Sequence, residues 1–424
     1  MQIIRYPDRK TWYEILKRPV YDPGSLKEVV IPVIDDVRQN GDAAVKKYTE
    51  RFDQIKVNDL VVSEAEIRDA CENTDESLKN AMRRAADNIG AFHKSQIQEY
   101  RVIETSPGVK CWQKSVAIEK VGLYIPGGSA PLFSTVLMLG IPAVIAGCKN
   151  IVLCTPPDKE GKVNPAILFA ADLAGIKNVY KIGGAQAIAA MAYGTESVPK
   201  VYKIFGPGNQ YVTIAKQLLS LEDVAIDMPA GPSEVAVMAD KSCNPRFVAA
   251  DLLSQAEHGE DSQVILVTTE ADIVNATLME IKEQLDRLQR SSIAVKALEN
   301  SKTFILNNED EMIDLINEYA PEHLIIAMKN YDAVKNRIIN AGSVFLGNYT
   351  PESAGDYASG TNHTLPTNGY ARSYSGVNLD SFVKKITFQE ITKQGLRDIG
   401  HVIEKMAEAE ALAAHGNAVR VRVG

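Results

Sequence analysis

The sequence predicts an α/β protein with two parallel-sheet domains, and three observations support this. At 424 residues the chain exceeds the length that one hydrophobic core normally serves, so two or more domains are expected. From residue 116 onward, short apolar segments with strand character alternate with segments of helical periodicity, a pattern typical of βαβ units and parallel sheets. Several of these apolar segments end in glycine-rich turns, where a backbone can approach a phosphate group beside a helix N-terminus.

The composition is that of an ordinary globular protein, with 45% hydrophobic and 24% charged residues. A net charge of −8 argues against nucleic acid or an anionic membrane as the main partner. Charged residues interrupt the first ten positions, so no secretory signal is expected, and the most apolar run, 135–148, is too short to span a bilayer. Five scattered cysteines without a CxxC pair fit reduced thiols. We expect a cytoplasmic protein that binds neither nucleic acid nor membrane.

Residues 1–115 are helix-rich and charged, and no catalytic pattern stands out among them. The run from Ser25 to Glu28 has the form of a capping box and predicts a helix start. Residues 75–100 have the periodicity of one long amphipathic helix. His93 lies in that helix beside Phe92, so packing or a solvated face is its expected role.

The alternating pattern predicts the elements in order. Strands are expected at 117–125, 151–155, 178–182, 200–205, 235–239, 263–268, 303–306, 324–327 and 342–346, with helices at 134–146, 165–174 and 187–192 among the connections. The turns Gly183-Gly184 and Gly206-Pro207-Gly208 follow two of these strands, but neither is a GxGxxG motif. Tight turns explain them as well as nucleotide binding does. A similar order of helix, glycine, strand and threonine, ending at Thr155 and again at Thr268, suggests two related halves.

The segment Leu252–Gly259 closes a predicted helix at the rim of a sheet. Asn244-Pro245 has the form of an N-cap followed by proline at the first helical position, and Gly259 is placed to follow the helix end. Gln255 and His258 would then share one face of the last turn. The pair fits a ligand site at such a rim. It also fits a plain polar last turn in which the helix dipole favours His258.

Further polar clusters follow in the second half of the chain. His258, His363 and His415, with Gln255 and Asp356, offer nitrogen and oxygen ligands without a thiolate, a set that suits a hard-to-borderline divalent metal. The loop 348–363, which holds Asp356 and His363, is long and rich in small polar residues, as functional loops are. A helix is predicted at 399–414; it carries Glu410 and ends at His415-Gly416, before a β-like tail at 418–423.

Glu322-His323 places a carboxylate beside an imidazole, a pair used in general acid–base chemistry. Simpler roles stay open at this point: Glu322 as a helix cap, His323 as a donor to a buried carbonyl, and Asp356 in an Asx turn. Sequence spacing alone does not show that these groups meet.

Taken together, six runs resemble the histidinol dehydrogenases, and the resemblance covers nearly the whole chain. The runs are 121–128, 204–209, 227–234, 252–259, 321–325 and 351–363. The resemblance implies one zinc ion per subunit, held by Gln255, His258, Asp356 and His415; His363 is not a ligand in that family. It implies NAD contacts at Tyr124, Gln186 and Asn209, and substrate contacts at Ser233, Gln255, His258, His323, Asp356, Glu410 and His415.

The resemblance also implies the reaction, a four-electron oxidation of L-histidinol to L-histidine through L-histidinal with two NAD, as the last steps of histidine biosynthesis. In it, His323 would act as base, Glu322 would activate water, and the metal would anchor the substrate. The family is a homodimer of intertwined chains whose C-terminal region completes the partner's site, so Glu410 and His415 are expected to act in trans.

The expected architecture is two incomplete Rossmann-like parallel-sheet domains plus small N- and C-terminal segments. The expected division is an N-terminal segment 1–22, a discontinuous first α/β domain of 23–115 and 233–366, a second α/β domain of 116–232, and a C-terminal helical segment 367–424. A related NAD dehydrogenase for another small amino- or sulfo-alcohol is the chief rival, and a metal-dependent binding or regulatory protein is a second. Intact Glu410 and His415, beside Glu322-His323, favour histidinol over both.

Overall fold

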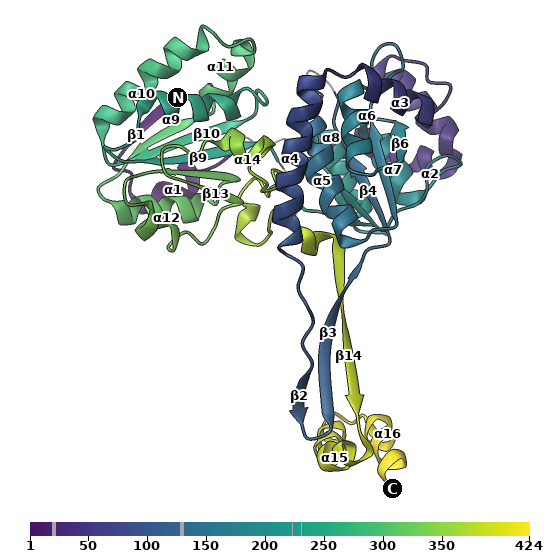
Figure 1. The fold of residues 1–424 in the computed structure, drawn as a ribbon. Coiled ribbons are helices and arrows are strands. Elements are labelled where there is room, and N and C mark those ends of the chain that lie inside the picture. The colour runs from purple at the N-terminus through teal and green to yellow at the C-terminus, as the bar shows by residue number, and fades with distance from the viewer. Residues whose placement is uncertain (19–22, 128–130, 223, 230) are drawn as a thin grey trace.

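Two parallel sheets with their covering helices form the body of the protein, and a long antiparallel arm projects from it (Figure 1). The computed structural model describes residues 1–18, 23–127, 131–222, 224–229 and 231–424. The expected α/β class with two parallel-sheet units is confirmed. The glycine-rich turn expected at 126–131 lies partly outside the described residues, as does the boundary expected at 22.

The larger sheet has six parallel strands in the order β1-β11-β10-β9-β12-β13. Its strands are β1 (Gln2–Arg5), β9 (Glu234–Ala239), β10 (Gln263–Thr268), β11 (Lys302–Ile305), β12 (His323–Ala327) and β13 (Ser343–Leu346). The central strands β9, β10 and β12 are buried along their whole length, as expected for apolar strands covered on both faces.

Helices cover both faces of this sheet and form two apolar cores with it. One core contains α9 (Pro245–Ala256), α10 (Ala271–Leu285) and α11 (Ser291–Glu299); the other contains α1 (Trp12–Ile15), α12 (Glu309–Tyr319) and α13 (Tyr331–Lys335). Asn244 caps α9 through the backbone N–H of Arg246, as predicted. The helix ends at Ala256, however, so His258 lies just beyond its last turn. Gly259 is not in the left-handed conformation expected of a helix terminator.

The smaller sheet has five parallel strands in the order β6-β5-β4-β7-β8. Its strands are β4 (Lys120–Tyr124), β5 (Asn150–Thr155), β6 (Asn178–Lys181), β7 (Lys203–Phe205) and β8 (Ala225–Ile226), and its crossover helices are α5 (Phe133–Ala146), α6 (Pro165–Leu173), α7 (Gly184–Tyr193) and α8 (Gln210–Leu219). Gly147 ends α5 with a φ of 88°, which is a conformation that favours glycine.

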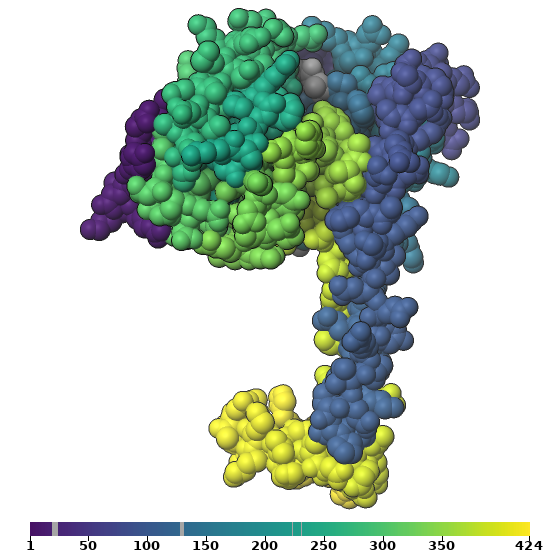
Figure 2. Space-filling model, turned by 60° about the vertical axis from the view of Figure 1, so that its left-hand side comes forward, coloured from purple at the N-terminus to yellow at the C-terminus, as the bar shows by residue number. Residues whose placement is uncertain are grey.

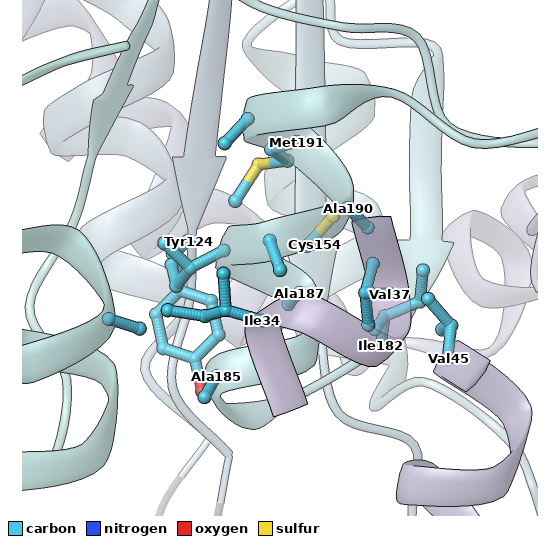
Figure 3. Packing of buried hydrophobic residues seen from close by; sticks show 14 of the residues in the cluster. Ile34, Val37, Val45, Tyr124, Cys154, Ile182, Ala185, Ala187, Ala190 and Met191 are labelled. Carbon is cyan, nitrogen blue, oxygen red and sulfur yellow. The ribbon is translucent and has the colours of Figure 1, made fainter. Parts of the chain in front are cut away.

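The N-terminal helices complete this smaller unit, which corrects the division expected from the sequence. They are α2 (Pro23–Asp53), α3 (Glu64–Asn73) and α4 (Glu76–Lys94). Figure 3 shows Ile34, Val37 and Val45 of α2 packed against α7, so residues 23–94 share their core with residues 116–226 and not with 233–366. Since α2 begins at Pro23, Ser25 lies inside the helix and is not its cap. His93 is fully buried and bonds the carbonyl of Ile89 at 2.9 Å, which confirms a packing role.

The arm is an antiparallel sheet of β2 (Ile103–Ser106), β3 (Val109–Ala117) and β14 (Val383–Ile391), in the order β14-β3-β2. Two helices, α15 (Lys393–Ala409) and α16 (Ala413–Val423), pack on each other at its tip, far from both parallel sheets (Figures 1 and 2). The β-like tail expected at 418–423 is therefore wrong, and the expected helical segment 367–424 also contains a strand. One strand cannot satisfy its own backbone groups, so β14 forms only because β3 lies beside it.

Short elements link these units: the 3₁₀ turns Arg9–Thr11, Tyr370–Arg372 and Leu379–Phe382, and helix α14 (Glu352–Tyr357), which lies inside the predicted polar loop. No helix in the described part of the chain has the length and apolar character needed to cross a membrane.

Candidate active site

The predicted catalytic pair lies at the amino-terminal edge of the six-stranded sheet. His323 begins β12 and Glu322 precedes it, while the neighbouring strand β9 begins at Glu234. Glu322 and His323 are only 6% and 4% exposed. Two charged side chains are costly to bury without partners, so their surroundings must satisfy them.

Three carboxylates and one carbonyl surround His323. Its Nδ1 lies 3.2 Å from the carbonyl oxygen of Glu234 and 3.7 Å from Oε atoms of both Glu322 and Glu352. Its Nε2 lies 3.6 Å from Oδ1 of Asp356. The backbone N–H of Glu234 donates to Oε2 of Glu322 at 2.8 Å, which fixes that carboxylate beside the imidazole. The structure thus places Glu322 and His323 close together, and it adds Glu352 to the pair.

A buried ion pair fixes the start of β9. Arg18 donates through Nε and Nη2 to the two carboxylate oxygens of Glu234, at 2.5 and 2.8 Å, and also to the carbonyl of Tyr319 at 2.7 Å. This bidentate geometry holds Glu234 in one orientation. The backbone of Glu234 contacts both Glu322 and His323, so Arg18 positions these two side chains indirectly.

The metal ligands expected from one chain meet at this same place. Gln255 lies in the last turn of α9 and is 1% exposed; with its amide nitrogen turned toward α14, it donates to Oε1 of Glu352. His258 lies close enough to Asp356 and His323 for their charges to act on it. Ser233, an expected substrate contact, is half-buried directly before β9.

His415 and Glu410 are not part of this cluster. Glu410 directly follows α15 and His415 lies in α16, at the tip of the arm (Figure 1). In the described part of the chain, no three His, Cys, Asp or Glu side chains gather closely enough to hold a metal ion. His363 has both ring nitrogens engaged, with Oγ1 of Thr135 at 3.1 Å and the carbonyl of Asp356 at 3.0 Å. It is therefore a structural residue and not a free ligand.

Burial and mutual charge shift the pKa values within the cluster. Burial raises the pKa of Glu322 to about 8. Burial alone would lower the pKa of His323, but the carboxylates of Glu352, Glu322 and Asp356 outweigh it and raise that pKa to about 10. Burial lowers the pKa of His258, which favours the neutral imidazole that metals bind. The pKa values of Glu322 and His323 are thus both raised, and strongly shifted pKa values at one place in a protein are more common at functional sites than elsewhere.

Asp251, one turn before Gln255 on α9, gives a test of this burial. Burial raises its pKa from 3.8 to about 7. A carboxyl whose pKa is higher in the folded state than in the unfolded state stabilises the fold at pH values below its unfolded-state pKa. That stabilisation is lost as the pH rises through its folded-state pKa. Asp251→Asn, which keeps the shape and one acceptor, should therefore raise the free energy of unfolding at pH 8.5 by on the order of 1 kcal/mol.

At pH 5 the free energy of unfolding of Asp251→Asn should rise much less. Thermal unfolding at both pH values measures the difference, and Asp286→Asn at an exposed helix end is the matched control. An equal change at the two pH values would show that Asp251 is not a desolvated acid.

The three residues expected to contact NAD line one cavity of about 630 Å³ at the carboxyl ends of the five-stranded sheet. Tyr124 ends β4, and its hydroxyl accepts from the backbone N–H of Gly184 at 3.1 Å. Asn209 caps α8 by accepting from two backbone N–H groups at 3.1 Å. Gln186 is fully buried, yet neither atom of its amide has a hydrogen-bond partner in the described residues. An amide left unpaired in a cavity wall indicates a missing polar ligand.

Comparisons with known proteins agree along nearly the whole chain. A family model described as histidinol dehydrogenase matches residues 16–423. The histidinol dehydrogenase of Bacteroides thetaiotaomicron is 62% identical over 423 residues, covering 100% of this chain and 99% of that protein. That of Yersinia pestis is 52% identical over 412 residues, covering 96% of this chain and 92% of that protein.

Solved structures give the same picture. A crystal structure of histidinol dehydrogenase from Elizabethkingia anophelis has a TM-score of 0.98 and 57% identity, covering 100% of this chain and 98% of that chain. An NAD-dependent aldehyde dehydrogenase from Sinorhizobium meliloti has a TM-score of 0.50 at 13% identity, with 88% of each chain covered. At that identity the second likeness is one of fold alone.

Proposed function

Because the chain belongs to the histidinol dehydrogenase family, a family of NAD-dependent oxidoreductases, we propose that it oxidises L-histidinol to L-histidine through L-histidinal with two NAD. The observation that carries this proposal is the cluster in which the buried side chains of Glu322, His323 and Gln255 lie near Asp356 and, at the exposed rim, His258. The cluster combines a proton-transfer pair with the oxygen and nitrogen donors that a substrate-anchoring metal needs.

His323 is the base of the first step. It takes the proton from the substrate hydroxyl while the carbinol carbon gives a hydride to the first NAD, which leaves the aldehyde. Only the neutral ring can accept this proton, and because the neighbouring carboxylates raise the pKa of His323 to about 10, the neutral form gains population as the pH rises toward that value. The same carboxylates stabilise the imidazolium that is formed. Because its carbonyl contact and three carboxylate neighbours lie on fixed elements, the ring is held in place for this transfer.

Glu322 acts in the second step. Its buried carboxylate takes a proton from a water molecule that attacks the aldehyde carbon, and the resulting hydrate is oxidised by a second hydride transfer to NAD. Burial raises the pKa of Glu322 to about 8, so the ionised form is a stronger base than an exposed glutamate. His323, 3.7 Å away, again accepts the hydroxyl proton in this oxidation.

The donors present fit a zinc ion, one per subunit. The donors are the amide oxygen of buried Gln255, the carboxylate of half-buried Asp356 and the imidazole of His258 at the exposed rim. When bound, the metal supplies Lewis-acid anchoring of the imidazole and amine of the substrate. The residues' own part is to hold these donors rigidly and to keep His323 next to the hydroxyl group.

The fourth ligand and one substrate contact come from a second subunit. His415 and Glu410 lie at the tip of the arm, and the chain places neither beside its own cluster (Figure 1). The tip exposes apolar side chains, among them Val402, Met406 and Val421, as an unpaired interface does. A homodimer in which each tip reaches the other body would complete both sites.

Counting reduced cofactor tests the reaction, the cofactor and the metal together. Purified protein with L-histidinol and excess NAD should form about two NADH per substrate consumed, as two successive two-electron oxidations require. Treatment with a chelator should abolish turnover, and added zinc should restore it. One NADH per histidinol would contradict the second step. Failure to turn over with zinc present would favour another amino alcohol as the substrate.

A further inference from the structure

An acidic side chain in the wall of the nucleotide cavity has no partner. Asp53 ends α2 and lines the cavity together with Phe52. Its Oδ2 is buried and has no hydrogen-bond partner in the part of the chain that the structure describes. Burial raises the pKa of this carboxyl to about 6. A carboxylate kept unpaired in a cavity costs stability, so a ligand that donates to it is the simplest reason for its place.

The cavity has two chemically different sides. On one side are the beginnings of α7 and α8, with the unpaired amide of Gln186; the N-cap residue of α7 is Gly183, which has no side chain to accept from the helix N–H groups. Backbone N–H groups and helix dipoles there favour phosphate oxygens. On the other side, Val29 and Phe52 of α2 leave 47% and 45% of their surface exposed. This apolar surface suits a purine base.

Asp53 adjoins residues of both sides. It follows Phe52 in the apolar wall, and its charge is close enough to act on the buried hydroxyl group of Tyr124, which binds the first N–H of α7. In a nucleotide with its base on the apolar wall and its phosphates at the helix beginnings, the ribose occupies the middle position. The hydroxyl groups of a ribose could donate the hydrogen bonds that the carboxylate of Asp53 otherwise lacks.

We propose that Asp53 accepts hydrogen bonds from the hydroxyls of the adenosine ribose of NAD and thereby excludes dinucleotides that carry a 2′-phosphate. This inference rests on the proposed use of NAD. A carboxylate receives a hydroxyl donor well, but it repels a phosphate group placed at the same distance. Lys159 also lines the cavity and is exposed, so without Asp53 a cation would remain to attract that phosphate.

A second acidic residue that lines the cavity, Asp158, allows a comparison with Asp53. Its Oδ1 already accepts from the backbone N–H groups of Glu160 and Lys162, at 2.8 and 2.9 Å. It serves a local turn and has no need of a ligand. Asp53 therefore differs from Asp158 by its missing partner, while both line the same cavity.

Direct binding to the full chain tests the proposal without turnover. Titration calorimetry compares 5′-AMP with adenosine 2′,5′-bisphosphate, which differ only at the 2′ position. The unaltered protein should bind 5′-AMP at least about tenfold more tightly. Asp53→Asn should weaken 5′-AMP binding by about tenfold and remove the preference, since the amide no longer repels phosphate. Asp286→Asn, an exposed change at the end of α10 outside the cavity, should keep both affinities.

Several outcomes would overturn the proposal. Equal affinity of the unaltered protein for the two ligands would do so before any variant is made. An unchanged preference in Asp53→Asn and in Asp53→Ser, with thermal midpoints that show folded protein, would also do so. In both cases histidinol oxidation with NAD could proceed, so the proposed function would stand. If neither nucleotide bound and histidinol gave no NADH, both proposals would fall together.

Discussion

Glu322→Gln should stop the reaction at the aldehyde, lowering the yield from about two NADH per histidinol to about one. Glutamine has nearly the same shape, and its amide oxygen can still accept the hydrogen bond that the backbone of Glu234 donates at 2.8 Å. It cannot take a proton from water. Loss of a positioned general base typically costs a factor of about 10²–10⁴, so this step should slow by that amount.

Supplying L-histidinal directly isolates the step. Its oxidation by Glu322→Gln, followed as NADH formation, should fall by the factor above, while reduction of histidinal by NADH should be largely retained. Glu299→Gln, an exposed change at the end of α11, controls for the loss of a carboxylate elsewhere. Unimpaired histidinal oxidation would show that another group activates the water.

Two inactive variants should restore activity when their chains are mixed. Gln255→Ala damages the body of the chain, and His415→Ala damages the tip of the arm. A heterodimer of the two would pair one intact body with one intact tip. After dissociation and random reassociation of equal amounts, half the dimers are mixed and each has one good site, so about a quarter of normal activity is expected.

Mixing Gln255→Ala with His258→Ala is the control, because both changes damage the body and no pairing repairs it. Size-exclusion chromatography of each mixture would show that chains reassociate. Reassociated dimers of the first mixture with no more activity than the control would show that the tip does not act in trans.

Local pattern was enough to predict most strands and several helices. The strand from 263 to 268 and the cap at Asn244 depend on neighbours within a few residues, so sequence periodicity records them directly. The β-like tail failed because alternating Val and Arg near the C-terminus imitate a strand, whereas packing of α16 on α15 favours a helix. The partner of α2 was also missed, since an amphipathic helix shows that it packs but not on which sheet.

In the candidate site too, the sequence predicted the contacts between neighbouring residues and missed those between residues far apart in the chain. Glu322 and His323 are adjacent in sequence, so their pairing was visible. Arg18 and Glu352 were missed because each acts through a residue distant in the chain, and nothing local distinguishes them from ordinary charged residues. Glu234 was visible only as the last residue of a run that resembles the family. Its backbone contacts to Glu322 and His323 arise only when β9 and β12 pair.

The two sheets contribute opposite edges: the larger one presents the beginnings of its strands to the catalytic cluster, and the smaller one presents the ends of its strands to the nucleotide cavity. In the proposed function, recognition of the alcohol and recognition of the nucleotide would therefore depend on separate hydrophobic cores. Substitutions in separate cores without shared partners are usually additive in free energy. Over evolutionary time, a lineage can alter its choice of nucleotide without disturbing its choice of alcohol, and the reverse, so the two specificities are free to drift independently.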